Sequence, residues 1–192
     1  VAGIDADPAV ARLAAEHGDI GAAVLAETAK LHAGDAENMR LWREFLPNCR
    51  DEIQRVYARL NVAFDHTLGE SFYHDRLAST VDDLIQRGIA EASQGAVCVF
   101  VEGHAAPMLI RKQDGAFLYA TTDLATIAYR VETWHPDAIL YVVDHRQSLH
   151  FEQLFATVRR MGLTEIELVH VSFGTVLGDD GRPFRTRAGD TV

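Results

Sequence analysis

The chain has 192 residues, of which 48% are hydrophobic and 24% are charged. That size allows one domain with a sizeable core, or part of a larger domain. The formal net charge of −10 disfavours contact with phosphate backbones, so the chain by itself is not expected to bind nucleic acid. No stretch approaches the ~20 uncharged apolar residues that a membrane span needs.

The two cysteines and the first residues narrow the class of protein further. Cys49 and Cys98 form no CxxC pair and no metal-ligand spacing, so we expect no bound metal, no disulfide framework and a reducing, cytoplasmic setting. Cys98 lies in an apolar run and is expected to fill the core. The start, Val1-Ala2-Gly3, has no initiator Met and no secretory signal pattern, so we expect it to lie inside a longer protein.

The first third of the chain is predicted to be helical. Residues 8–34 are rich in alanine and predict one or two short helices, broken near Gly18. Residues 41–60 place apolar side chains at spacings of three and four, which predicts a helix that Pro47 kinks or splits. We therefore expect a helical segment over residues 1–60 that leads into a second region.

From residue 61 onward, strand and helix patterns alternate. Strands separated by helices imply parallel pairing, so the predicted fold class is α/β, with a doubly wound, mainly parallel, Rossmann-like sheet over residues 61–192. Helical periodicity predicts helices at 77–85 and 151–158, and between them a helix capped by Thr121 or Thr122. Apolar runs predict strands at 62–64, 96–101, 108–110, 117–119, 138–143 and 166–171, with a turn at Asp114-Gly115.

Polar side chains follow the carboxyl ends of four of these strands, where open α/β sheets bind ligands. Several carboxylates and amides would converge on one crevice there, which favours a cationic ligand rich in hydrogen-bond donors. The residues at these ends are Glu70, Tyr119, Asp123, Asp144, Gln147, His170, Phe173 and Gly174.

Each candidate also has a purely structural interpretation. Asp123 near a helix start can compensate the helix dipole, and Gln147 can be an ordinary helix-start residue. Glu70 can be a solvated turn residue, and Tyr119 can belong to the core. His170 at a strand end can be a hydrogen-bonded structural histidine. From spacing alone, both interpretations stay open.

A Gly-flanked basic loop at residues 178–189 contains Arg182, Arg185 and Arg187. Guanidinium groups bind phosphate through paired hydrogen bonds, so the loop predicts a phosphate contact. An ordinary solvated loop is the alternative. The chain contains neither GxGxxG nor GxxxxGK[ST], which disfavours a dinucleotide site or a P-loop.

Six blocks of the chain together resemble the arginyl-tRNA synthetases, which are class I enzymes. Their order and approximate spacing agree with that family from residue 38 to the end, whereas residues 1–37 are similar only loosely. The blocks are 59–62 (RLNV), 69–71 (GES), 114–125 (DGAFLYATTDLA), 140–150 (LYVVDHRQSLH), 170–178 (HVSFGTVLG) and 183–189 (PFRTRAG).

The resemblance implies a parent enzyme that activates L-arginine with ATP to arginyl-adenylate and passes it to the terminal ribose of tRNA(Arg). ATP is then a substrate, accompanied by Mg²⁺, and no prosthetic group is implied. Most tRNA contact is expected outside this chain. By motif position, the implied arginine contacts are Glu70, Tyr119, Asp123 and Gln147, the ATP contacts are His170, Phe173, Gly174 and Val176, and the phosphate loop holds Arg185, Thr186 and Arg187.

Three departures from the family pattern bear on what the chain does by itself. The class I signature His-Ile-Gly-His and the helical domain expected to read the anticodon are absent, so residues 1–192 alone are expected to be inactive. Arg185 stands where many relatives carry Lys, and Asp190 stands where Gly is usual, which leaves the roles of these two residues open.

Two alternatives accompany this interpretation. One is a non-catalytic paralogue that binds arginine or a nucleotide. The other is a nucleotidyltransferase that shares the same sheet. The set Tyr119, Asp123 and Gln147 disfavours the latter, because such an enzyme needs no guanidinium pocket.

Overall fold

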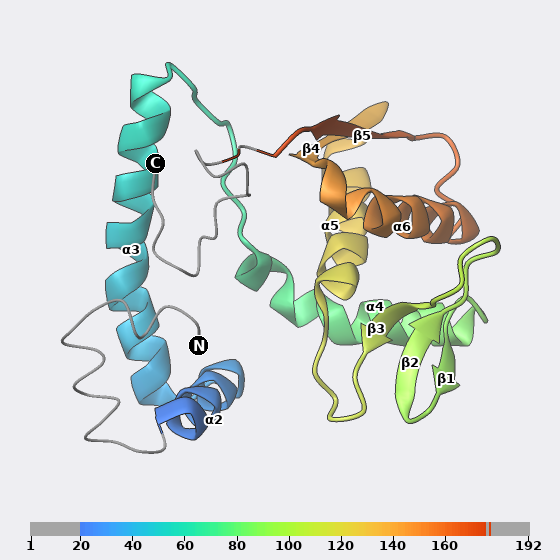
Figure 1. The fold of residues 1–192 in the computed structure, drawn as a ribbon, viewed down its shortest axis with the longest axis horizontal. Coiled ribbons are helices and arrows are strands. Elements are labelled where there is room, and N and C mark those ends of the chain that lie inside the picture. Colours follow the sequence, from blue (N-terminus) through green and yellow to red (C-terminus); the bar gives the residue numbers. More distant parts are fainter. Residues whose placement is uncertain (1–19, 176, 178–192) are drawn as a thin grey trace. The chain divides into compact units, whose positions relative to one another are not determined.

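The computed structural model of the chain describes residues 20–175 and 177, and it divides into two compact units (Figure 1). The first unit includes the chain up to His66, and the second spans Thr67–Thr175. None of the helices among the described residues is both long and apolar enough to cross a membrane.

The described part of the first unit contains the helices α2 (Ile20–His32) and α3 (Ala36–Arg59). Asp35 caps α3, because its Oδ1 accepts the backbone N–H groups of Glu37 and Asn38, each at 3.1 Å. The helix continues through Pro47 as one element of 24 residues, so of the predicted kink or split the proline does not cause a split. No residue of α3 is buried, so water can satisfy the carbonyl that the proline leaves unpaired. The helix prediction for residues 8–19 lies outside the described residues.

Residues 62–64, predicted as a strand, are irregular. The backbone N–H of Val62 donates to the carbonyl oxygen of Tyr57 at 2.9 Å, which extends the end of α3. The ring of Phe64 lies edge-on to the ring of Tyr57, with 4.8 Å between centroids. This short apolar run therefore packs on the preceding helix and does not enter a sheet.

The second unit carries two sheets and the helices that cover them. Its buried side chains form one main core, to which Leu84 of the first α-helix, Leu124 of the second and Leu154 of the third all contribute. In chain order the elements are η2 (Glu70–Tyr73), α4 (His74–Gln86), β1 (Glu91–Ser93), β2 (Ala96–Val99), β3 (Met108–Arg111), α5 (Tyr119–Trp134), β4 (Ala138–Asp144), η3 (His145–Gln147), α6 (Ser148–Arg160) and β5 (Glu167–Phe173).

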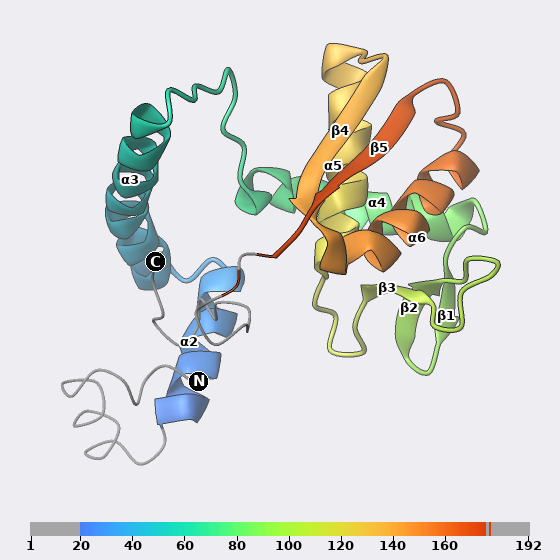
Figure 2. The same cartoon turned by 45° about the horizontal axis from the view of Figure 1, so that its top comes forward.

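Strands β4 and β5 pair in parallel, with Ala138 opposite Glu167 and Asp144 opposite Phe173. Helix α6 connects them, and Figure 2 shows α5 and α6 on the same side of the two strands. This βαβ unit confirms the predicted α/β class with parallel pairing. The strand alternation directs one row of side chains, including Ile139, into the core, while the other row is exposed. The large exposed side chains of that row are Leu140, Val142, Val171 and Phe173.

The other sheet has the order β1-β2-β3 and is antiparallel throughout. The parallel pairing expected of the alternating pattern therefore holds for β4 and β5 but not for these shorter strands. Cys98 of β2 is buried, as predicted, and burial raises the pKa of its thiol. The predicted turn at Asp114-Gly115 is present, with Gly115 at a φ of +86° that favours glycine. Beyond it only Phe117 pairs with β3, through a single bridge to Arg111.

Helix α5 begins at Tyr119, earlier than the predicted cap at Thr121 or Thr122. Thr121 is fully buried, and its hydroxyl donates to the carbonyl oxygen of Ile110 at 2.5 Å. That bond ties the first turn of α5 to β3, so the hydroxyl is not available as a cap. The earlier start places Asp123 in the second turn of α5, where the helix dipole acts only weakly.

Candidate functional site

Asp123 of α5 and His150 of α6 form a hydrogen-bonded pair near the starts of the two helices. The Nε2 of His150 lies 2.7 Å from Oδ2 of Asp123, and the imidazole is 9% exposed while the carboxyl group is 31% exposed. Tyr119, the first residue of α5, is 59% exposed. Its ring lies edge-on to the imidazole, with 4.7 Å between centroids. One imidazole therefore contacts two of the four predicted arginine-binding residues.

Gln147 is exposed at the end of η3, the short turn between β4 and α6. Asp144 fixes this turn. Its Oδ1 accepts the backbone N–H of Arg146 at 2.8 Å and the Nε–H of the same residue at 2.9 Å. Its Oδ2 accepts the hydroxyl of Thr175 at 2.9 Å. The hydrogen bonds from Arg146 hold the pKa of the Asp144 carboxyl well below its usual range. The turn that carries Gln147 is thus held by a carboxylate at the carboxyl end of β4.

Glu70 is the first residue of η2 and is exposed. The element packs on α5, because the ring of Phe72 lies 5.2 Å and the ring of Tyr73 lies 5.7 Å from the ring of Tyr129. Tyr73 is buried in a small cluster with Ala125. Within the described residues the side chain of Glu70 makes no hydrogen bond and no ion pair, so its carboxylate is open to a ligand. The structure gives no direct contact between Glu70 and the Asp123–His150 pair.

His170 lies near the carboxyl end of β5. Its Nε2 is 3.0 Å from the carbonyl oxygen of Val143, and its ring is 4.5 Å from the ring of Phe151. These contacts within the chain are enough to fix the position of the His170 side chain. The predicted contact between His170 and adenine stays a prediction. Phe173 ends the strand with 52% of its surface exposed, and Gly174 follows it, also exposed. The predicted contacts Val176, Arg185, Thr186 and Arg187 lie outside the described residues.

Two buried polar atoms beside this region have no hydrogen-bond partner among the described residues: the hydroxyl oxygen of Tyr141 and the Nε of Arg130. The guanidinium group of Arg130 lies over the Tyr141 ring, 5.7 Å from its centroid. Burial raises the pKa of Tyr141, and this effect outweighs the opposing effect of the Arg130 charge. The phenol therefore stays protonated at neutral pH.

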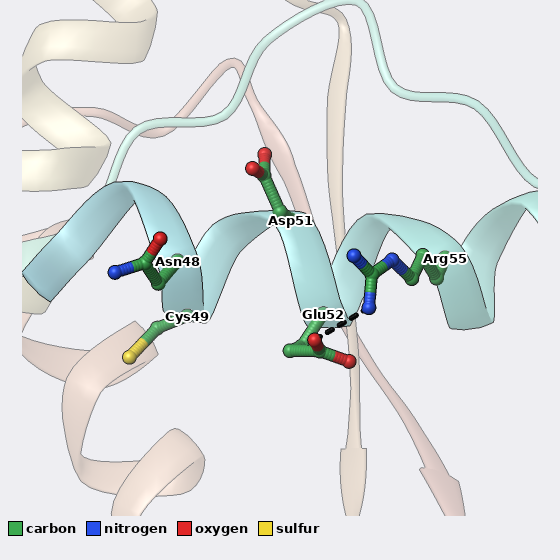
Figure 3. A pocket seen from close by; sticks show the side chains of 5 residues that line it. All are labelled: Asn48, Cys49, Asp51, Glu52 and Arg55. Atoms are coloured by element: carbon green, nitrogen blue, oxygen red, sulfur yellow. Dashed lines mark hydrogen bonds and ion pairs between the residues drawn. The ribbon is translucent and has the colours of Figure 1, made fainter.

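A depression of about 360 Å³ on α3 is a separate feature in the first unit. Figure 3 shows that the side chains lining it all come from this one helix and that Asp51 points away from Glu52. Glu52 pairs with Arg55 at 2.6 Å, and both side chains are about 70% exposed. We interpret this depression as a solvated helix surface, since no groups from a second element converge on it.

The sequence interpretation assigned no role to His150, although it lies inside one of the family-like blocks. The helical repeat of α6 did contain a signal for a role of His150. His150 lies four residues before Leu154 and eight before Val158, so it shares the inward face of α6 with two fully buried residues. A histidine on such a face needs a polar partner, and the partner proved to be Asp123 on the neighbouring helix.

Comparison with known proteins gives the family. A family model described as "tRNA synthetases class I (R), catalytic domain" matches residues 17–192. The chain is 61% identical over 189 residues to the arginine–tRNA ligase of Rhodopirellula baltica, and 48% identical over 177 residues to that of Frankia casuarinae. These alignments cover 98% and 87% of this chain but 28% and 30% of the two relatives. The chain therefore spans less than a third of their length.

The solved arginyl-tRNA synthetase of Plasmodium falciparum is similar in structure, with a TM-score of 0.74 and 27% sequence identity. The match covers 79% of this chain and 27% of that one. It agrees with the α/β architecture that the strands and helices of the second unit show. Because the family model extends over every described residue, the chain belongs to the catalytic-domain family of the class I tRNA synthetases for arginine.

Proposed function

We propose that this chain is the part of an arginine–tRNA ligase that binds the amino acid and the adenine of ATP. The observation that carries the proposal is the cluster of Tyr119, Asp123 and His150 near the starts of α5 and α6. It presents a partly exposed carboxylate beside an exposed aromatic ring, at the sheet edge where α/β proteins bind ligands. In a doubly wound fold, such a cluster suits a cationic substrate.

The chemistry of the cluster favours arginine over other cations. A carboxylate such as Asp123 pairs with a planar guanidinium group through two parallel hydrogen bonds, and a tyrosine ring can stack on the same group. Lysine presents a point charge that cannot make the paired contact. Glu70 supplies the second carboxylate, and Gln147 holds the amino end of the substrate. The second pair of contacts would come from η2, which directly precedes α4, and from η3, which directly precedes α6.

The remaining contacts serve ATP and follow from the family. His170, Phe173, Gly174 and Val176 contact adenine, and the loop with Arg185, Thr186 and Arg187 contacts the phosphates. Magnesium accompanies ATP as part of the substrate. Protein sites for this ion commonly rely on substrate phosphates and one or two carboxylates, so the proposal needs no three-ligand cluster, and the described residues contain none. No prosthetic group takes part.

The proposed reaction begins when the carboxylate of arginine attacks the α-phosphate of ATP. A bond forms between that carboxylate oxygen and phosphorus, the bond to the bridging oxygen breaks, and pyrophosphate leaves. The adenylate then passes arginine to the terminal ribose of tRNA(Arg), releasing AMP. Catalysis of this kind depends mainly on positioning and charge stabilisation. In this proposal residues 1–60 lead into residues 61–192, which are the second half of the catalytic domain and end in the phosphate-binding loop. The parent enzyme would be cytoplasmic, with most of its tRNA contacts outside this chain.

The test is arginine-dependent ATP–pyrophosphate exchange by a full-length enzyme that carries this chain. We expect exchange with arginine, and at least about a hundredfold lower kcat/KM with citrulline, which has the same shape but lacks the charge that the carboxylates bind. Lysine, with its single ammonium group, should also fail. Arginine binding without any exchange would support the non-catalytic paralogue, and equal exchange with lysine would contradict the proposed pocket.

A further inference from the structure

His150 lies where it can control the proposed arginine site without touching the substrate. Its imidazole is 9% exposed, and Nε2 lies 2.7 Å from Oδ2 of Asp123. Within the described residues, the imidazole is the one hydrogen-bond partner of that carboxylate's side-chain oxygens. The rotamer of Asp123 is therefore fixed from the side of α6.

The ring makes further contacts that fix its own position. It lies edge-on to Tyr119, with 4.7 Å between centroids, and edge-on to Phe151 at 5.2 Å. Ser148, two residues before it, donates its hydroxyl to the carbonyl oxygen of His145 at 2.6 Å and so fixes the start of α6. A ring held by aromatic neighbours on a fixed helix can direct a hydrogen bond with little freedom.

The pair leaves the carboxylate able to bind a guanidinium group. An ionised carboxylate has about four acceptor positions on its two oxygens, and the imidazole occupies one of them. Oδ1 and the second position on Oδ2 stay open for a paired contact with a guanidinium group. Two of the proposed arginine contacts are connected through His150: Asp123 by the hydrogen bond and Tyr119 by the ring contact.

We propose that His150 is a positioning residue that orients Asp123 and Tyr119 for the guanidinium group of arginine. The proposal rests on the proposed function, because it assigns a task within the same site. A histidine that only joined α5 to α6 would add to stability and leave arginine binding unchanged once the protein is folded. The two cases therefore differ in kinetics as well as in stability.

Two variants separate the ring from its hydrogen bond. His150→Phe keeps the aromatic contacts with Tyr119 and Phe151 but removes the donor. His150→Gln removes the ring and keeps an N–H near the position of Nε2. In the full-length enzyme, His150→Phe should raise the arginine KM about tenfold, the scale of losing one hydrogen bond to a charged group, while the ATP KM stays within about twofold. His150→Gln should recover most of that loss.

His104 provides the matched control. Its Nε2 lies 3.4 Å from Oε2 of Glu152, also on α6, and its side chain is 18% exposed. His104→Phe thus removes another histidine–carboxylate contact to the same helix, away from Asp123. It should leave both KM values unchanged. Thermal melts of each variant identify any loss that comes from unfolding.

A double-mutant cycle with Asp123→Asn completes the experiment. If His150 acts through Asp123, His150→Phe should have little further effect on the arginine KM in the Asp123→Asn background. Normal arginine kinetics in His150→Phe, with a raised arginine KM in Asp123→Asn, would overturn the positioning role and leave the proposed function intact. Normal arginine kinetics in both single variants would instead count against the proposed arginine site itself.

Discussion

The hydroxyl of Thr175 lies 2.9 Å from Oδ2 of Asp144, and this bond connects the second residue after β5 to the last residue of β4. The other oxygen of the same carboxylate holds Arg146 in the turn before α6. Asp144 therefore connects the two segments that follow the parallel strands, and these segments carry several of the proposed substrate contacts.

Asp144 should contribute stability that depends on pH. Its folded-state pKa lies below the ordinary value of 3.8, so its contribution is full above that value and is lost as the pH falls below it toward the folded-state pKa. Asp144→Asn should therefore lower the melting temperature at neutral pH, and the difference from the unchanged chain should shrink between pH 4 and more acidic conditions. Thermal melts across that range measure this.

Glu132→Gln is the control for Asp144→Asn. It removes a carboxylate whose ion pair with Arg76 is largely exposed, and such surface pairs contribute about 0–1 kcal/mol. Its melting temperature should change less than that of Asp144→Asn at neutral pH. An Asp144→Asn variant that melts like the unchanged chain at every pH would show that this carboxylate does not hold the two segments.

Thr121 should stabilise the start of α5. Its hydroxyl donates to the carbonyl oxygen of Ile110 in a fully buried position, so Thr121→Val leaves that carbonyl without its side-chain donor. We expect a loss of about 1–2 kcal/mol in the free energy of unfolding, measured by denaturant titration.

Thr157→Val is the matched substitution for Thr121→Val. Thr157 is also fully buried, but its hydroxyl donates to the carbonyl oxygen of Gln153 within α6. A helix-interior carbonyl keeps its backbone hydrogen bond, so this variant should lose less stability. Equal losses in the two variants would argue against a special role for the bond between α5 and β3.

Removing the Tyr141 hydroxyl should cost almost nothing. The oxygen is buried and has no hydrogen-bond partner among the described residues, so Tyr141→Phe should change the free energy of unfolding of the chain by less than about 0.5 kcal/mol. Tyr141→Leu should cost about 1–3 kcal/mol, because it removes the ring contacts with Phe151 and Phe155. A substantial loss in Tyr141→Phe would mean that the hydroxyl has a partner.

The phosphate loop is tested by Arg185→Ala combined with Arg187→Ala in the full-length enzyme. Two basic side chains in a Gly-flanked loop suit the triphosphate end of ATP. The double variant should lower the adenylation rate, measured in single-turnover experiments, more than it weakens arginine binding. An unchanged rate would support the alternative of a solvated loop.

The elements that the sequence predicted best are those whose own apolar pattern determines them. The strands β4 and β5 and the inward face of α6 were predicted because each segment carries its own apolar pattern, although one row of side chains on the two strands is exposed. The start of α5 was not, because it depends on the bond between Thr121 and Ile110, eleven residues earlier in the chain. Residues 62–64 were misassigned because three apolar residues can pack on a helix as readily as they can pair in a sheet.

In the candidate site, too, the features that depend on contacts between distant segments could not be predicted from the sequence. Strand ends and family-like blocks pointed to Asp123 and Tyr119, since local sequence places both near a helix start. The link between them was not predictable, because His150 comes 27 residues after Asp123 and only the packing of α5 against α6 brings the two side chains together. A hydrogen bond between two helices is set by tertiary structure and leaves little trace in local spacing.

Steady-state kinetics of Asp123→Asn in the full-length enzyme test the central claim, that this carboxylate binds the guanidinium group of arginine, most directly. Asparagine keeps the size of the side chain but cannot form the charged pair, and hydrogen bonds to charged groups contribute roughly 1.5–3 kcal/mol. We predict that the arginine KM rises about ten- to a hundredfold while the ATP KM changes little. A lower melting temperature with unchanged arginine kinetics would contradict the claim and leave Asp123 as a structural partner of His150.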